Sequence, residues 1–107
     1  GIDADNIVLA NISGNTVAGV LSNGIEVGNA LLVNISDNNV VFTGNDGIHV
    51  EQSNLVGVRN NTVAFNIGDG IDVEDSSNVA ITGNTVRFSG DNGIELQSSD
   101  TVLIDNN

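Results

Sequence analysis

The chain repeats the same pattern every 23 residues without an insertion or a deletion. A Gly-Ile pair opens each copy, at Gly1, Gly24, Gly47, Gly70 and Gly93. Self-similarity at a fixed period is typical of architectures in which each unit packs against the next. We therefore treat residues 1–107 as one solenoid segment, whose repeats cover residues 1–23, 24–46, 47–69, 70–92 and a partial 93–107.

Each repeat contains three short segments in which apolar residues alternate with other residues, as in Ile71–Val73, Val79–Ile81 and Val86–Phe88. Such alternation predicts strands with one buried face, and the Gly, Asn, Asp and Ser residues between them predict turns. We expect the inward side chains to stack in three rows that form the core: Ile25, Ile48, Ile71, Val33, Val56, Val79, Ile35, Ile81, Val40, Val63, Val86, Phe42, Phe65 and Phe88.

A unit this short cannot bury its apolar face alone, so the copies must stack. If each copy is one coil, every strand pairs in parallel with its equivalent about 4.8 Å away. The prediction is an all-β parallel β-helix with 23-residue coils and three short strands per coil. A leucine-rich repeat would need a Leu-rich strand motif and usually a helical segment, and an antiparallel sandwich has no use for strict spacing.

An asparagine recurs with the same period, at Asn15, Asn38, Asn61, Asn84 and Asn107. In stacked coils these side chains lie above one another, where amides can form a ladder of hydrogen bonds. Asparagine also tolerates the left-handed backbone conformation, which a sharp bend between the second and third strands would require. We predict that this ladder is structural.

The motifs G-I-x-V, S-x-N-V-x-I and G-N-T-V follow one another in Gly70–Val73, Ser76–Ile81 and Gly83–Val86. In these motifs the chain resembles the right-handed parallel β-helix proteins, which include pectate-lyase-like folds and the repeat modules of secreted bacterial proteins. The resemblance covers the whole chain. It implies a right-handed solenoid at an extracellular or cell-surface location, but no particular chemistry, because many functions use this scaffold.

The formal net charge is −12, with fourteen Asp and Glu residues against Arg59 and Arg87. This balance repels phosphate backbones and anionic lipid, so we expect neither nucleic acid nor a membrane as a partner. The chain has no cysteine, which argues against a disulfide framework or a thiolate metal site. No cofactor is required by any motif.

An acidic row occupies the third residue of each repeat: Asp3, Glu26, His49, Asp72 and Glu95. Like charges stacked so closely are unfavourable, and solvent, raised pKa values or bound Ca²⁺ could relieve them. The residues that could hold Ca²⁺ lie in the densest part of this acidic region: Asp69, Asp72, Glu74, Asp91 and Glu95. The alternative is a solvated acidic face without a metal.

A catalytic site for polysaccharides would need a proton-transferring residue and a sugar-binding surface in addition to this acidic row. His49 lies between Glu26 and Asp72, and carboxylates on both sides favour its imidazolium form. The lyases of this class pair Ca²⁺-binding Asp residues with a basic residue, whereas Arg59 and Arg87 lie on other predicted strands. The chain has no Tyr or Trp to act as a sugar platform. We therefore predict no catalytic residue within it.

Uninterrupted repeats predict a non-catalytic extracellular scaffold, surface stalk or filament subunit, either a window of a longer solenoid or a unit that stacks end to end. Val8, Leu31 and Leu32 form a predicted contact strip, because three consecutive apolar residues in each of the first two repeats cannot all point inward. The expected partners are other copies or flanking repeats. The alternative function is part of a polysaccharide-active lyase, epimerase or hydrolase, or of a carbohydrate-binding tailspike or adhesin.

Overall fold

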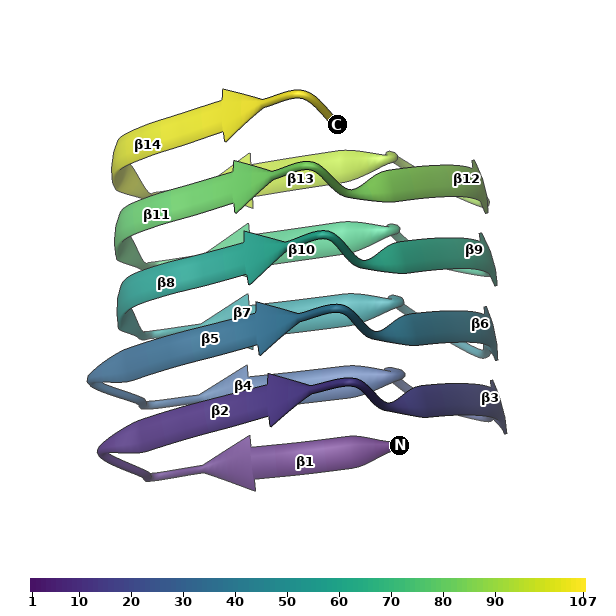
Figure 1. The fold of residues 1–107 in the computed structure, drawn as a ribbon, viewed down its shortest axis with the longest axis horizontal. Helices are drawn as coiled ribbons and strands as arrows, with labels where there is room; N and C mark the ends of the chain where they lie inside the picture. The colour runs from purple at the N-terminus through teal and green to yellow at the C-terminus, as the bar shows by residue number, and fades with distance from the viewer.

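The computed structural model describes all 107 residues as stacked coils of β-strands, without a helix (Figure 1). The first sheet contains β1 (Ile2–Asp5), β4 (Ile25–Gly28), β7 (Ile48–Glu51), β10 (Ile71–Glu74) and β13 (Ile94–Gln97). The second contains β2 (Leu9–Ser13), β5 (Leu32–Ser36), β8 (Asn54–Arg59), β11 (Ser77–Thr82) and β14 (Asp100–Asp105). The third contains β3 (Thr16–Val20), β6 (Asn39–Thr43), β9 (Thr62–Asn66) and β12 (Thr85–Ser89).

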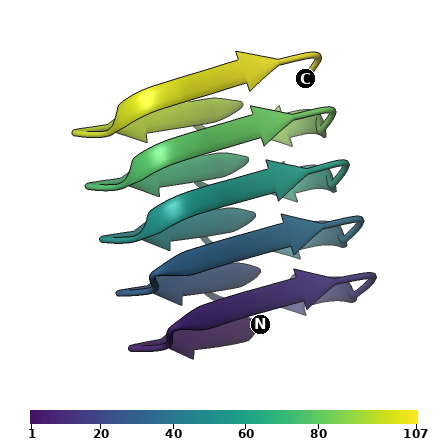
Figure 2. The same cartoon turned by 60° about the vertical axis from the view of Figure 1, so that its left-hand side comes forward.

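Every strand pairs in parallel with the strand one repeat away. Ile25 is opposite Ile48, Val33 is opposite Val56, and Val40 is opposite Val63. Figures 1 and 2 show the coils rising from the N-terminus to the C-terminus as a right-handed solenoid. The predicted β-helix, with three strands in each full coil, is confirmed. No helix capable of crossing a membrane is present.

The core is a column of aliphatic side chains between the three sheets. Of the predicted core residues, the buried ones are Ile25, Ile48, Ile71, Val33, Val56, Val79, Ile35, Ile81, Val40 and Val63. Val86 packs against this core but is only partly buried, because it lies on β12, the edge strand of the third sheet. Val27, Val50 and Val73 of the first sheet complete the interior.

The prediction that the three phenylalanines lie inside is wrong. Phe42, Phe65 and Phe88 are stacked, with ring centroids 5.0 and 4.8 Å apart, but they are 59%, 48% and 69% exposed. Their φ angles of 57°, 59° and 54° are left-handed. A left-handed residue breaks the alternation of an extended strand, so the ring turns outward. The inward place is taken by the next residue, as in the buried Thr43 and Asn66.

The asparagine ladder is confirmed. In its centre, the Oδ1 of Asn61 accepts hydrogen bonds from both the backbone N and the Nδ2 of Asn38, each 3.0 Å long. The Nδ2 of Asn61 donates to Asn84 Oδ1 and to the carbonyl of Ile35, each at 3.0 Å. The left-handed residue at this bend comes one place earlier than expected, as in Asn60, and the ladder residues themselves have no positive φ.

Close contact between coils explains the glycine that opens each repeat. A Cβ added to Gly47 would lie 2.6 Å from the carbonyl oxygen of Gly70 and would also collide with the Val63 side chain. The backbone can pass this point only without a side chain. The Gly-Ile pair therefore marks the start of the first sheet, where the acidic row lies.

Candidate functional site

The predicted acidic row lies on the first sheet, in register from coil to coil. Glu26 is opposite His49, His49 is opposite Asp72, and Asp72 is opposite Glu95. Their neighbours Ile71 and Val73 point into the core, so the row occupies the outer face of the sheet. Asp72 is nevertheless only 4% exposed.

A second column, which the sequence analysis did not identify, lies beside this row. It consists of the residue that ends each full repeat: Asn23, Asp46, Asp69 and Asn92. Asp46 Oδ1 accepts a hydrogen bond of 2.8 Å from Asp69 N, and Asp69 Oδ1 accepts one of 2.6 Å from Asn92 N. Asp46 and Asp69 are each 8% exposed. The signal was available as an Asn or Asp at every twenty-third residue.

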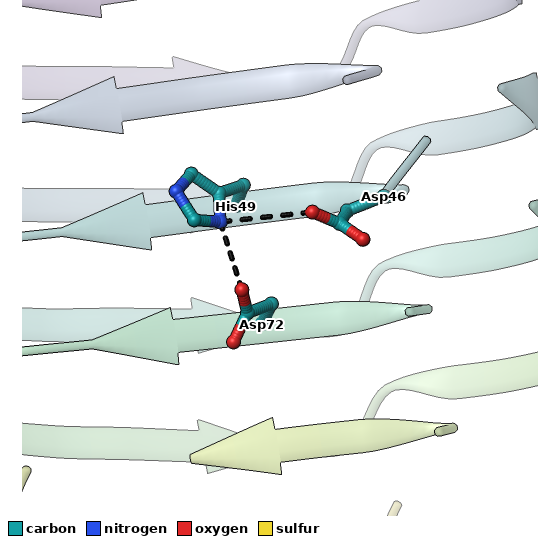
Figure 3. A group of neighbouring side chains, drawn as sticks. All are labelled: Asp46, His49 and Asp72. Carbon is teal, nitrogen blue, oxygen red and sulfur yellow. Dashed lines mark hydrogen bonds and ion pairs between the residues drawn. The ribbon is translucent and has the colours of Figure 1, made fainter. Parts of the chain in front are cut away.

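His49 connects the two columns. Its Nδ1 lies 2.9 Å from Asp72 Oδ2 and 3.7 Å from Asp46 Oδ2 (Figure 3). The hydrogen bond to Asp72 raises the pKa of His49, burial opposes the shift, and the charges of Asp72 and Asp46 add to it. For Asp46, in contrast, burial is the main cause of its raised pKa. Glu26, the other expected neighbour, instead accepts a hydrogen bond of 3.0 Å from Asn23.

Three of the five predicted calcium ligands come together. Carboxylate oxygens of Asp69, Asp72 and Glu95 all lie within 4.8 Å of one another. Hydrogen bonding to Asp69 is the main cause of the raised pKa of Glu95. Glu74 lies outside this trio, but the charge of Asp72 raises its pKa. Asp91 is exposed and is not part of the group.

The three residues of the predicted contact strip are exposed. Val8 is 72%, Leu31 is 56% and Leu32 is 40% exposed, at the bend that leads into the second sheet. The two coils are joined there by a hydrogen bond of 2.9 Å from Leu32 N to Val8 O. Leu32 also lines a groove of about 390 Å³ on the outer face of the second sheet, together with Leu55 and Arg59.

The comparison with protein families decides the classification. A family model described as "right handed beta helix region" matches residues 1–107. The chain belongs to the right-handed β-helix family. Neither the curated proteins nor the solved structures yield a match to this β-helix chain. Family membership agrees with the observed fold and leaves its chemistry open, because function depends on the site rather than on the fold.

Proposed function

We propose that this β-helix is a structural scaffold of the extracellular space, a surface stalk or filament subunit without catalytic activity. The observation that carries the proposal is the unbroken register of the coils: all strand partners are 23 residues apart, and no turn contains an insertion. Binding and catalytic sites are disproportionately built from loops held on a rigid scaffold. Here every turn is short, and the outer surface is a stack of similar coils.

The stacking of coils suits the role of a scaffold that extends along one axis. Each coil contacts only its neighbours, so the length of a solenoid can increase coil by coil. At each end, strands such as β1 and β13 leave one edge unpaired in the first sheet. Unpaired edges are templates for another strand of the same kind. Flanking repeats or a second copy can therefore continue the stack axially, and a contact of this head-to-tail type builds a filament when it does not close.

Lateral contacts would use the contact strip. Val8, Leu31 and Leu32 are adjacent in two stacked coils, so their exposed apolar surface is continuous rather than scattered. Contiguous apolar surface of this kind marks interaction sites more often than isolated residues do. The partner in this proposal is another copy of the solenoid or a flanking segment of the same chain.

The test is the assembly state of the purified protein. We expect sedimentation velocity and negative-stain microscopy to show elongated particles or filaments. Val8→Asp combined with Leu31→Asp should weaken lateral assembly while circular dichroism stays β-rich. Leu21→Asp is the matched control, because Leu21 is 96% exposed but lies outside the strip. A compact monomer at all concentrations would contradict the proposal of a filament. If the double variant assembled as wild type does, the contact strip would have no role in lateral assembly.

A second candidate is a polysaccharide-active enzyme, which the cluster of Asp46, His49 and Asp72 favours. An imidazole held between two carboxylates could act in proton transfer. Three observations weaken this candidate. The raised pKa of His49 favours the charged form, which cannot accept a proton. Arg59 is on the second sheet, and the Phe65 ring is stacked between Phe42 and Phe88. A sugar stacks on an uncovered aromatic face, and the Phe65 ring offers none.

A direct assay of turnover distinguishes the scaffold from the enzyme. Wild type and His49→Ala are incubated with neutral and anionic polysaccharides, and reducing ends, unsaturated products and epimer content are measured. The scaffold predicts no turnover by either protein. Turnover by wild type that is lost in His49→Ala would establish the enzyme and overturn the scaffold.

A further inference from the structure

We propose that Asp69, Asp72 and Glu95 bind one Ca²⁺ ion, which links successive coils of the solenoid on the outer face of the first sheet. Asp69 ends one repeat, Asp72 lies on β10, and Glu95 lies on β13. Two oxygens bound to one Ca²⁺ at about 2.4 Å can be at most about 4.8 Å apart. The carboxylate oxygens of this trio satisfy that limit for every pair.

An independent observation points to a ligand at this place. Asp72 is only 4% exposed, and its buried Oδ1 has no hydrogen-bond partner. Its other oxygen, Oδ2, is held by His49. Figure 3 shows the two oxygens of Asp72 pointing in different directions, one toward His49 and the other away from it. A buried carboxylate oxygen without a partner is costly, and a cation would satisfy it.

Only one basic side chain contacts the trio. His49 is the only histidine and contacts Asp46 and Asp72, not Asp69 or Glu95. The two arginines lie on β8 and β12, in the other sheets. The trio therefore has three acidic groups and no basic partner except the shared imidazole of His49.

A second group of side chains, one coil earlier, occupies the same three positions of the repeat. Asp46, His49 and Asp72 correspond to Asp69, Asp72 and Glu95 after a shift of 23 residues. In the earlier group the central residue is His49, whose Nδ1 lies 2.9 Å from Asp72 Oδ2 and 3.7 Å from Asp46 Oδ2. In the later group the central residue is Asp72. A bound cation would satisfy carboxylate oxygens there, as the ring of His49 does for Asp72 Oδ2 one coil earlier.

The ligand chemistry favours Ca²⁺ over other ions. All three side chains offer carboxylate oxygens, which are hard ligands, and the chain has no thiolate. Strands β10 and β13 set the positions of Asp72 and Glu95, and the turn before β10 sets that of Asp69, so the ligand geometry follows the coil spacing rather than an octahedron. Ca²⁺ accepts irregular shells of six to eight oxygens, whereas Mg²⁺ demands near-ideal octahedral geometry. Water and the remaining carboxylate oxygens would complete the shell.

The experiment is calorimetric titration of chelator-treated protein with CaCl₂, and in parallel with MgCl₂, followed by thermal melts with Ca²⁺ or chelator. We expect one Ca²⁺ per chain and a higher Tm in Ca²⁺, with Mg²⁺ binding more weakly. Glu95→Gln and Asp69→Asn should each weaken binding about tenfold or more. Asn can still accept the hydrogen bond that Asp69 receives from Asn92, and Glu95 is partly exposed, so both variants should fold.

Glu26→Gln is the matched control, because it removes one charge from the same row but lies outside the trio. It should bind Ca²⁺ like wild type. A gain-of-function variant tests the repeat argument: His49→Asp gives the earlier group three carboxylates, and the stoichiometry should rise from one to two. Absence of binding at millimolar Ca²⁺, or equal losses in Glu26→Gln and Glu95→Gln, would overturn the site. These readouts involve neither assembly nor turnover, so they stand apart from the proposed function.

Discussion

Two columns of polar side chains follow the axis of the solenoid, the asparagine ladder inside and the acidic row outside. Both stack equivalent residues one coil apart, so the distance between neighbours is similar. Asn61 is 1% exposed and has all its side-chain hydrogen bonds, whereas Asp72 is 4% exposed and has an oxygen without a partner. The two side chains are almost equally buried, but only the asparagine has a hydrogen-bond partner for each of its polar atoms.

The chemical cause is that an amide carries both a donor and an acceptor, whereas a carboxylate carries only acceptors. A column of asparagines can therefore pair with itself for any number of coils. A column of carboxylates cannot, and each member needs a proton, a basic side chain, solvent or a cation. His49 supplies a donor to Asp72 in one coil, and backbone N–H groups supply donors to Asp46 and Asp69.

The strongest test of this contrast places a carboxylate where none of these partners is available. Ile71 is completely buried at the centre of the core. Ile71→Asp should lower the free energy of unfolding by more than about 4 kcal/mol, because it combines a lost aliphatic side chain with an unpaired buried charge. Urea unfolding followed by circular dichroism measures the effect. A variant as stable as wild type would show that the assigned core register is wrong.

Changing the ladder should have the next largest effect. Asn61→Ala should cost about 1–3 kcal/mol, because the amides of neighbouring coils lose their partners. Asn61→Asp should cost more near neutral pH and partly recover in acid, where a protonated carboxyl can again donate. Urea unfolding measures both variants.

Asn39→Ala is the control for the ladder. Asn39 is exposed and its side chain makes no hydrogen bond. Its replacement should change the stability by less than about 0.5 kcal/mol. Equal losses in the Asn39 and Asn61 variants would show that the ladder does not contribute.

The contribution of the acidic row to the stability of the protein should depend on pH through His49. Its folded pKa is raised from 6.5, so the stabilisation that it contributes is fully present below pH 6.5 and is lost as the pH rises through the folded pKa. We expect the stability of wild type relative to His49→Gln to fall over this window. Urea unfolding in chelator between about pH 6 and 9 measures it. A difference that does not vary with pH would show that the imidazolium contributes nothing.

A difference of only one aromatic pair is expected between two variants of the phenylalanine column, which stacks outside without hydrogen bonds. Phe65 stacks on both Phe42 and Phe88, whereas Phe88 stacks on Phe65 alone. Each aromatic pair is worth about 0.5–1.5 kcal/mol beyond its burial. Phe65→Ala should therefore destabilise the protein by about one pair more than Phe88→Ala. Thermal melts of both variants provide the measurement, and the opposite order would contradict the stacking.

Register, strand number and ladder could all be predicted from the period of the sequence. In a parallel solenoid, equivalent residues lie directly above one another, so a repeat in the chain becomes a column in space. This is why Asn61 could be paired with Asn38 and Asn84 before the fold was known. The row of Asp72 and its neighbours followed from the same reasoning.

The direction of a side chain at a bend could not be predicted in this way. Alternation assumes extended backbone, and Phe65 has a φ of 59°, which turns the ring out and Asn66 in. The trio of Asp69, Asp72 and Glu95 depends on the same kind of detail, because the turn before Gly70 brings Asp69 against the outer row. The sequence period sets which residues share a column, whereas the backbone angles of the turns set which columns meet.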